Sequence, residues 1–237
     1  MTTVVITGSN GQLGQFFVKE LVGCGFKVIG IDKNPNNFKG SANFHFECLD
    51  ITKQDQVNDF FIKQKKIDIL INNAGIGVFT KFEDRTAEEF TEVMNVNLLG
   101  TFLMMRGAVQ IMKKNGGGKI INIASIYGSR SSDFRIYGKS GRNNSEVYSA
   151  TKAGVISLTK YAAAHFAEFN IQVNSISPGG IFNNQATEFV KNYEMKTPVG
   201  RMGKVDDLRS TLFYLIDHQN TYVNGQDIAV DGGFLAW

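Results

Sequence analysis

The chain has 237 residues, of which 43% are hydrophobic and 20% charged, and its formal charge is +3 at pH 7. These values suit one globular α/β domain, residues 1–237, better than two small ones. No apolar run is long enough to cross a bilayer, and the positive charge forms no dense basic block, so we expect no membrane span and no nucleic-acid partner.

Cysteine and histidine usage points away from disulfide and metal chemistry. The two cysteines are too few for a disulfide framework, and His45, His165 and His218 lack metal-ligand spacing. The amino terminus has no basic region followed by an apolar signal segment. We therefore expect a cytoplasmic protein with no bound metal.

A short β-branched run at residues 4–6 predicts a buried parallel strand, which leads into the sequence TGSNGQLG at residues 7–14. Apolar residues then recur at helical spacing until Gly23 and Gly25. A glycine-rich turn at a helix amino terminus lets backbone N–H groups approach a pyrophosphate. The spacing departs from G-x-G-x-x-G, so a plain loop is the alternative.

Residues 28–32 form the second predicted strand, and it ends in Asp32, 24 positions beyond Gly8. An acid at this place accepts hydrogen bonds from the adenosine ribose and repels a 2′-phosphate, which favours NAD over NADP. Lys33 follows directly and could moderate that repulsion, and an acidic strand end beside a turn is the alternative.

A third strand is predicted at residues 44–48, before Asp50 and Ile51, and a helix with a capping box is predicted to begin at Thr52. The fourth strand, at 67–71, leads into Asn73, Ala74 and Gly75. A second capping box at Thr86 begins a long predicted helix that ends at Gly116.

Asn97 lies inside this long predicted helix. Asparagine is unfavourable in a helix interior, so the residue has either a functional reason or a simple surface position. A fifth strand at 119–123 brings Ser125 to the carboxyl end of the sheet, where ligands bind in open parallel sheets. A polar segment, residues 126–147, follows it.

Tyr148 and Lys152 are four residues apart at the start of an apolar helical run and should share one helix face. A fixed ammonium stabilises a phenolate and lowers the phenol pKa toward neutrality, so the pair could exchange a proton with an alcohol or ketone. The alternative is a solvated helix face. A sixth strand at 171–176, a last helix at 205–216 and a strand at 227–230 complete a seven-fold alternation that predicts a doubly wound, seven-stranded parallel sheet flanked by helices.

The ordered set of these pieces resembles the short-chain dehydrogenase/reductase family over nearly the whole chain. It comprises residues 7–14, Asp32, Asp50, residues 72–75, Asn97, Ser125, Tyr148, Lys152, Pro178 with Gly179, and residues 230–233. The resemblance implies a Rossmann-type domain that binds a nicotinamide cofactor.

The resemblance also implies roles for single residues. Tyr148 would be the general acid/base, Lys152 would lower its pKa and hold the nicotinamide ribose, Ser125 would bind the reacting oxygen, and Asn97 would position a water. The implied cofactor-binding residues are Gly8, Asn10, Gln12, Leu13, Gly14, Asp32, Asp50, Ile51, Asn73, Ala74, Gly75, Tyr148, Lys152, Pro178, Gly179 and Ile181. The cofactor itself would supply the hydride transfer.

Two features depart from the family pattern. Gln12 stands where many members carry glycine, a spacing also seen in longer members that modify nucleotide sugars. The gap from Ser125 to Tyr148 is longer than the family usually has, which leaves Ser131, Ser132 and Ser140 as alternative serines.

The long gap makes residues 126–147 a substrate-side insertion, which we call the insertion. It is similar to loops in members from bacterial surface-sugar and flagellin-modification pathways. We hypothesise that Arg130, Arg135, Lys139 or Arg142 binds an anionic group of a sugar or sugar phosphate, with a solvated or subunit-facing loop as the alternative.

The sequence thus predicts an NAD-dependent oxidoreductase that interconverts a secondary alcohol and a ketone on a small, sugar-like molecule. The alternatives are a nucleotide-sugar epimerase or dehydratase and a non-catalytic NAD-binding regulator. Family members commonly pair through the helices around Phe102 and Ile156, so we expect a homodimer or homotetramer.

Overall fold

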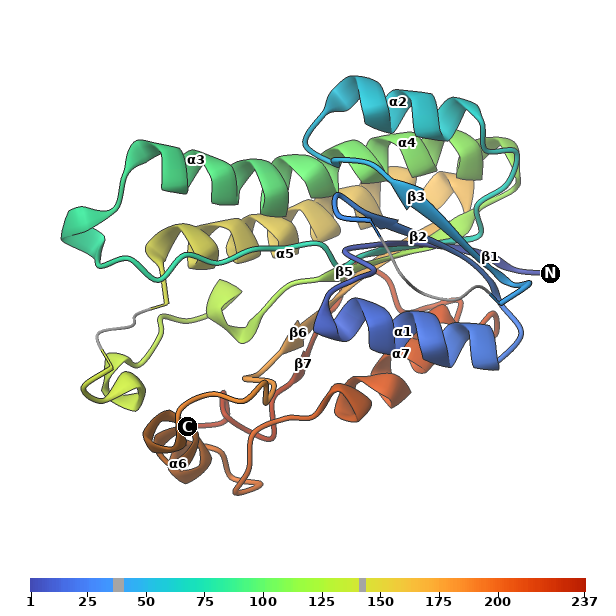
Figure 1. Cartoon of the computed structure of the whole chain (residues 1–237). Helices are drawn as coiled ribbons and strands as arrows, with labels where there is room; N and C mark the ends of the chain where they lie inside the picture. The colour runs from blue at the N-terminus through green and yellow to red at the C-terminus, as the bar shows by residue number, and fades with distance from the viewer. Residues whose placement is uncertain (36–40, 141–143) are drawn as a thin grey trace.

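A computed structural model describes residues 1–35, 41–140 and 144–237, and its centre is a seven-stranded sheet (Figure 1). The strand order is β3-β2-β1-β4-β5-β6-β7, and every neighbouring pair is parallel. The strands are β1 (Thr3–Thr7), β2 (Lys27–Asp32), β3 (Phe44–Cys48), β4 (Ile69–Asn72), β5 (Gly118–Ile123), β6 (Ile171–Pro178) and β7 (Asp227–Val230). The predicted doubly wound, Rossmann-like sheet is confirmed.

Helices cover both faces of the sheet (Figure 1). One face carries α1 (Gln12–Gly23) and α7 (Arg209–Ile216), and the other carries α2 (Gln54–Ile62), α4 (Thr101–Lys114) and α5 (Glu146–Phe166). Helix α3 (Ala87–Met94) continues into α4, and α6 (Thr187–Lys196) lies apart, near the carboxyl ends of β6 and β7.

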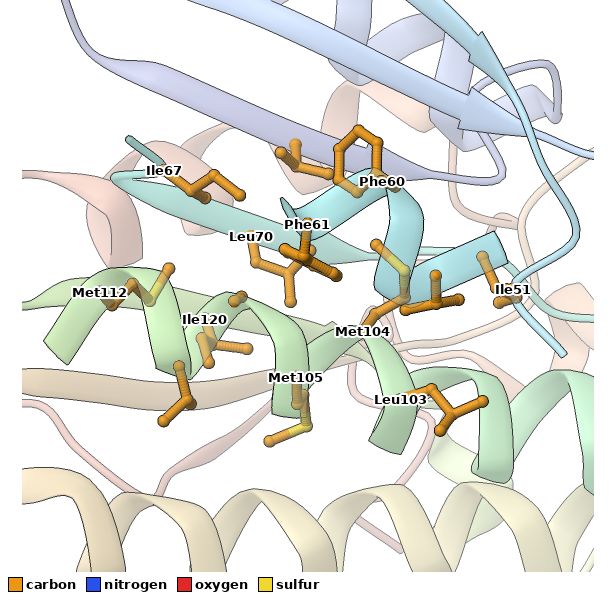
Figure 2. Packing of buried hydrophobic residues seen from close by; sticks show 14 of the residues in the cluster. Ile51, Phe60, Phe61, Ile67, Leu70, Leu103, Met104, Met105, Met112 and Ile120 are labelled. Carbon is orange, nitrogen blue, oxygen red and sulfur yellow. The ribbon is translucent and has the colours of Figure 1, made fainter. Parts of the chain in front are cut away.

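The alternation of side chains along each strand explains the two layers. In β1, Val4 and Ile6 pack with α1 and α7, whereas Val5 points to the opposite face. On that face Phe61 of α2 and Met104 of α4 pack over the sheet (Figure 2). Both faces of the central strands β1 and β4 are buried, which is why their sequences are apolar runs, whereas the edge strand β3 alternates apolar and polar residues.

Three local predictions are corrected by the structure. Helix α2 begins after Lys53 without a side-chain cap, because Asp50 Oδ1 accepts both the backbone N–H (2.9 Å) and the hydroxyl (2.8 Å) of Thr52 and holds that residue in the turn before the helix. The long helix predicted after Thr86 is capped as expected, but it contains a π-helical segment at Asn95–Gly100. Helix α6 was not predicted.

The described residues of the insertion include 3₁₀ turns at Ile126–Gly128 and Phe134–Tyr137. Its described residues and α6 both lie beyond the carboxyl ends of the strands. Within the described part of the chain, no helix is both long and apolar enough to cross a membrane.

A glycine at the α2–α4 contact provides a test of this packing. A Cβ on Gly107 would lie 2.1 Å from a ring carbon of Phe61, whereas one on Gly23 would meet nothing within 4 Å. We expect Gly107→Ala to lower the free energy of unfolding by about 1–3 kcal/mol through overpacking. Gly23→Ala, the control, should leave it within about 0.5 kcal/mol. Urea unfolding of both variants measures this, and equal effects would contradict the close packing.

Candidate active site

The glycine-rich turn after β1 lines one end of a cavity of about 700 Å³ at the carboxyl edge of the sheet. Gly8 has φ +64°, and a Cβ there would lie 2.7 Å from the Cα of Ala74. Gly14 closes the turn against α1, where a Cβ would lie 2.1 Å from the Gly8 carbonyl oxygen. Asn10, Gln12 and Leu13 line the cavity, and Gly14 lies behind them.

Asp32 ends β2 at the cavity wall. Its Oδ2 accepts the backbone N–H of Asn10 (3.1 Å), and its Oδ1 accepts that of Asn34 (3.0 Å). These bonds fix the carboxylate beside the glycine-rich turn. Lys33 lines the same wall, so the two charges expected from the sequence are both present there.

Asp50 and Ile51 follow β3 and also line the cavity. Asp50 Oδ1 accepts the backbone N–H of Thr52 (2.9 Å), which holds the loop in place. Ile51 packs against Gly100, where a Cβ would come within 2.6 Å of its Cδ1.

The segment after β4 is tied to β1. The side-chain amide of Asn73 donates to the carbonyls of Thr7 (3.1 Å) and Gly8 (3.0 Å). The Thr7 hydroxyl accepts the backbone N–H groups of Asn73 and Ala74, both at 3.1 Å. Together with Gly75, these residues form the cavity wall between β1 and β4.

Asn97 is buried behind that wall, inside the π-helical segment. Its Oδ1 accepts the N–H of Ile76 (2.8 Å), and its Nδ2 donates to the Ile76 carbonyl (2.9 Å) and to Thr151 Oγ1 (3.1 Å). The amide therefore joins the loop after β4 to α5. Asn97 thus lies next to the site but does not line the cavity. Its burial rules out the alternative that it is a surface residue of the helix.

Lys152 reaches the cavity from α5 and is only 5% exposed. Its Nζ donates to the carbonyl of Ile123, the last residue of β5 (2.7 Å). Burial lowers the pKa of this ammonium to about 8, because a charged group is poorly solvated there.

Tyr148 stands one helical turn before Lys152, and the Lys152 Nζ lies 5.6 Å from its ring centroid. Burial raises the pKa of Tyr148, and a hydrogen bond with Ser125 opposes that shift. The lowered pKa expected from the sequence is therefore not found in this structure, since desolvation outweighs the hydrogen bond with Ser125.

Ser125 follows β5, is buried and lines the cavity beside Tyr148. Its Oγ accepts the backbone N–H of Tyr127 (3.2 Å), which fixes the hydroxyl at the end of the strand. Ser131, Ser132 and Ser140 do not line this cavity. The arrangement thus favours Ser125 among the four candidate serines.

Pro178 ends β6, Gly179 and Ile181 follow it, and all three line the cavity. The side-chain amide of Gln12 donates to the carbonyl of Phe182 (2.7 Å), 170 positions later in the chain. This bond joins the turn after β1 to the segment after β6.

Sequence reasoning missed the aromatic residues that complete the cavity. Tyr127 and Tyr137 come from the insertion, and Phe189 and Tyr193 come from α6. The Tyr193 hydroxyl accepts the backbone N–H of Gly180, which ties α6 to the segment after β6. The apolar spacing of Phe189, Val190 and Tyr193 is the signal that could have predicted α6.

The cationic residues of the insertion do not line this cavity where the structure describes them. Arg130 donates to the carbonyls of Phe234 (3.3 Å) and Trp237 (3.1 Å), and Arg135 forms a two-fold pair with Asp133 (2.9 and 2.8 Å). Lys139 is exposed. Arg142 lies outside the described residues.

The site combines a phenol, a hydroxyl and a buried amine around one point of an elongated cavity. Such a set can bind the oxygen of an alcohol or ketone and exchange one proton with it. The glycine-rich turn and the Asp32 carboxylate suit a dinucleotide, the first for its pyrophosphate and the second for its ribose. Among residues 1–35, 41–140 and 144–237, no three His, Cys, Asp or Glu side chains gather as a metal ion would require.

Comparison with known proteins gives a consistent match. A family model described as enoyl-(acyl carrier protein) reductase matches residues 13–235. The chain is 34% identical to 2-dehydro-3-deoxy-D-gluconate 5-dehydrogenase of Bacillus subtilis, covering 99% of this chain and 94% of the relative.

Two solved structures are similar in fold. A short chain dehydrogenase from Leptospira borgpetersenii with bound NAD⁺ is 45% identical, with a TM-score of 0.94 over 98% of this chain and 92% of that one. The structure of ElxO with NADP bound is 27% identical, with a TM-score of 0.86 over 100% and 99% of the two chains.

The buried amine makes stability depend on pH. Lys152 has a pKa of about 8 in the folded chain against 10.5 ordinarily, so between these values only the unfolded chain holds the proton. The free energy of unfolding should therefore increase as the pH rises from 8 to 10.5. The gain is complete above pH 10.5, and it is absent below pH 8, where both the folded and the unfolded chain hold the proton.

Thermal unfolding of the cofactor-free protein at pH 7, 8, 9 and 10 checks this, with Lys152→Met as the reference that cannot titrate. The melting temperature of the native chain relative to the variant should rise with pH. A constant difference would show that Lys152 titrates normally.

Proposed function

Because the chain belongs to the short-chain dehydrogenase/reductase family, whose members are oxidoreductases acting on CH–OH groups, we propose that it interconverts a secondary alcohol and a ketone with a nicotinamide cofactor. The observation that carries this proposal is the meeting of Tyr148, Ser125 and Lys152 at one point of the cavity. A cofactor-binding regulator would have no need of such a proton-exchanging group.

Each of these residues has a role that its contacts support. In the oxidation direction, Tyr148 as phenolate takes the hydroxyl proton of the substrate, and Ser125 donates a hydrogen bond to the reacting oxygen. Lys152, held by the Ile123 carbonyl, stabilises the phenolate by its charge. Asn97 acts through its bonds to Ile76 and Thr151, which set the wall and the helix that carry these groups.

A nicotinamide cofactor would supply the hydride acceptor, while Tyr148 takes the proton, so that removal of one hydride and one proton from the alcohol gives the ketone. The pyrophosphate of the cofactor would be held by the glycine-rich turn, through Gly8, Asn10, Gln12 and Leu13 at the cavity and Gly14 behind them. The remaining contacts would come from Asp32, Asp50, Ile51, residues 73–75, Tyr148, Lys152, Pro178, Gly179 and Ile181.

We propose NAD as the preferred cofactor. Asp32 presents a fixed carboxylate where the adenosine ribose would lie, and it would repel a 2′-phosphate. The similar Leptospira structure contains NAD⁺, which agrees with this preference, although ElxO contains NADP.

We propose a small sugar-like substrate. The relative from Bacillus subtilis carries a sugar acid in its name, and the insertion and α6 leave a cavity of a size typical for small molecules. The insertion would contact this substrate.

We further propose that the chain forms a homodimer or homotetramer through α4 and α5, which lie side by side (Figure 1). Phe102 of α4 and Tyr161 of α5 are large side chains exposed on these helices, and Leu99 precedes α4 with 40% of its surface exposed. Such exposed apolar residues favour contact with a second copy.

Replacing the phenol tests the catalytic proposal. Tyr148→Phe keeps the ring and removes the proton-exchanging group, so we expect kcat to fall by at least about 100-fold. Absorbance at 340 nm with NAD and a panel of sugars and polyols measures turnover, and quenching of protein fluorescence measures NAD binding, which should change little. Undiminished turnover would contradict a role for Tyr148.

Replacing the carboxylate tests the cofactor preference. Asp32→Ser keeps an acceptor for the loop N–H groups and removes the charge, so kcat/KM with NADP should rise at least tenfold relative to NAD. Lys33→Ala is the matched variant and should shift the preference in the opposite direction. A native chain that already prefers NADP would overturn the NAD proposal.

A further inference from the structure

The cavity has two halves that differ in charge. The half built by the segments after β1, β2 and β3 contains Asp32, Lys33 and Asp50. The other half is built by the insertion, by α5 and by the segments that follow β6, including α6. Among the described residues that line this second half, the only charged side chain is Lys152.

Lys152 is committed within the protein. Its Nζ is bonded to the Ile123 carbonyl, and it faces Gly75, where a Cβ would lie 3.4 Å from the Nζ. It therefore belongs at the boundary between the two halves, next to the reacting groups. It is not placed to bind a carboxylate or phosphate at the far end of a substrate.

The described cations of the insertion and of α6 that lie near this half point elsewhere. Arg130 is held by the carbonyls of Phe234 and Trp237, and Asp133 forms ion pairs with both Arg135 and Lys196. These four side chains line a separate cavity. A substrate anion in the second half would lose water without gaining a positive partner among the described residues, which is costly.

What the second half does offer is hydroxyl and amide groups among aromatic rings. The hydroxyls are those of Ser125, Tyr127, Tyr137 and Tyr148, and the amide is that of Asn144. Tyr193 and Gln185 also line this half, but the Tyr193 hydroxyl accepts the Gly180 N–H, and the Gln185 amide is bonded to the Asn183 N–H and the Ile181 carbonyl. Phenols combine an apolar face with a hydrogen-bonding edge, which matches the C–H faces and hydroxyl groups of a polyol or sugar.

The insertion and α6 pack against each other where they line this half of the cavity. Tyr137 is 8% exposed, and its ring packs on Phe189 with centroids 5.2 Å apart. The side-chain amide of Asn192 donates to the Ile136 carbonyl (3.4 Å), and Ile136 is fully buried between the two segments. The contacts between the insertion and α6 therefore fix the position of Tyr137 at the cavity.

We propose that the substrate is an uncharged polyhydroxylated compound, and that Tyr137 of the insertion is a specificity-determining residue for it. This inference rests on the proposed alcohol–ketone oxidoreduction. It replaces the anion-binding role that the sequence suggested for Arg130, Arg135 and Lys139. It also separates this chain from relatives that are named for a sugar acid.

Matched neutral and anionic compounds test the substrate class. D-sorbitol, D-gluconate and D-sorbitol 6-phosphate form one set, and the D-mannitol and galactitol frameworks give two more. In the set whose carbon skeleton the enzyme accepts, we expect kcat/KM with NAD to be at least about tenfold higher for the neutral polyol than for the sugar acid or the polyol phosphate. A neutral β-ketoacyl thioester with NADH is included because several relatives are named 3-oxoacyl-[acyl-carrier-protein] reductase.

Variants link the preference to the residues. Tyr137→Phe keeps the packing on Phe189 and removes the hydroxyl, so KM for the neutral substrate should rise about tenfold with a smaller change in kcat. Tyr222→Phe, at a side chain that is 99% exposed and outside the cavity lining, is the control and should change neither. Gln185→Arg adds a cation and should raise the anionic-to-neutral ratio of kcat/KM about tenfold.

The outcomes separate this inference from the proposed function. A higher kcat/KM for an anionic member of a set would overturn the inference. If Tyr148→Phe also abolishes that turnover, the oxidoreductase function still stands. Loss of the anionic preference in Arg142→Ala would then identify Arg142 as the cation that binds the substrate anion. Turnover of the thioester alone overturns the substrate class in the same way. Absence of turnover with every compound, thioester included, counts against the proposed function and the inference together.

Discussion

The site depends on holding an amine in a nearly water-free position at the carboxyl edge of the sheet. The bond from Lys152 to the last carbonyl of β5 compensates part of the cost of burial, and it orients α5 relative to the sheet. The amide of Asn97 fixes the same helix from the other side, through Thr151. Tyr148 and Ser125 are placed by these two anchors, because one lies on the anchored helix and the other directly after the anchored strand.

The two halves of the cavity are constructed differently. The half proposed for the cofactor consists of short turns after strands, fixed by backbone bonds such as those from Asn73 to the end of β1. The half proposed for the substrate is made largely by two segments far apart in the chain, the insertion and α6, which pack on each other and on Phe234. Function that varies between relatives can change in the second half while the first stays intact.

The sequence predicted the strands, and the residues that meet at their carboxyl ends, because both depend on local patterns. Apolar β-branched runs indicate buried strands, and parallel strands place the residues that follow them at one edge, so the place of Asp32, Asp50 and Ser125 in one cavity follows from position alone. The π-helical segment could not be predicted, since it depends on the bonds of Asn97 to distant groups. The capping box at Thr52 was wrong because Asp50 holds Thr52 in the turn before the helix. The directions of Arg130 and Arg135 depend on the carbonyls of Phe234 and Trp237 and on Asp133, partners that charge counting does not identify.

The bond from Gln12 to the Phe182 carbonyl has a consequence for the mobility of the cavity wall. It connects the first turn of the fold to the segment after β6, and both segments line the same cavity. The bond is exposed to solvent, so it contributes only about 1 kcal/mol and favours the joined arrangement about five-fold without locking it. A glycine at position 12 has no side chain to form this bond, so the segment after β6 would lose a link to the glycine-rich turn.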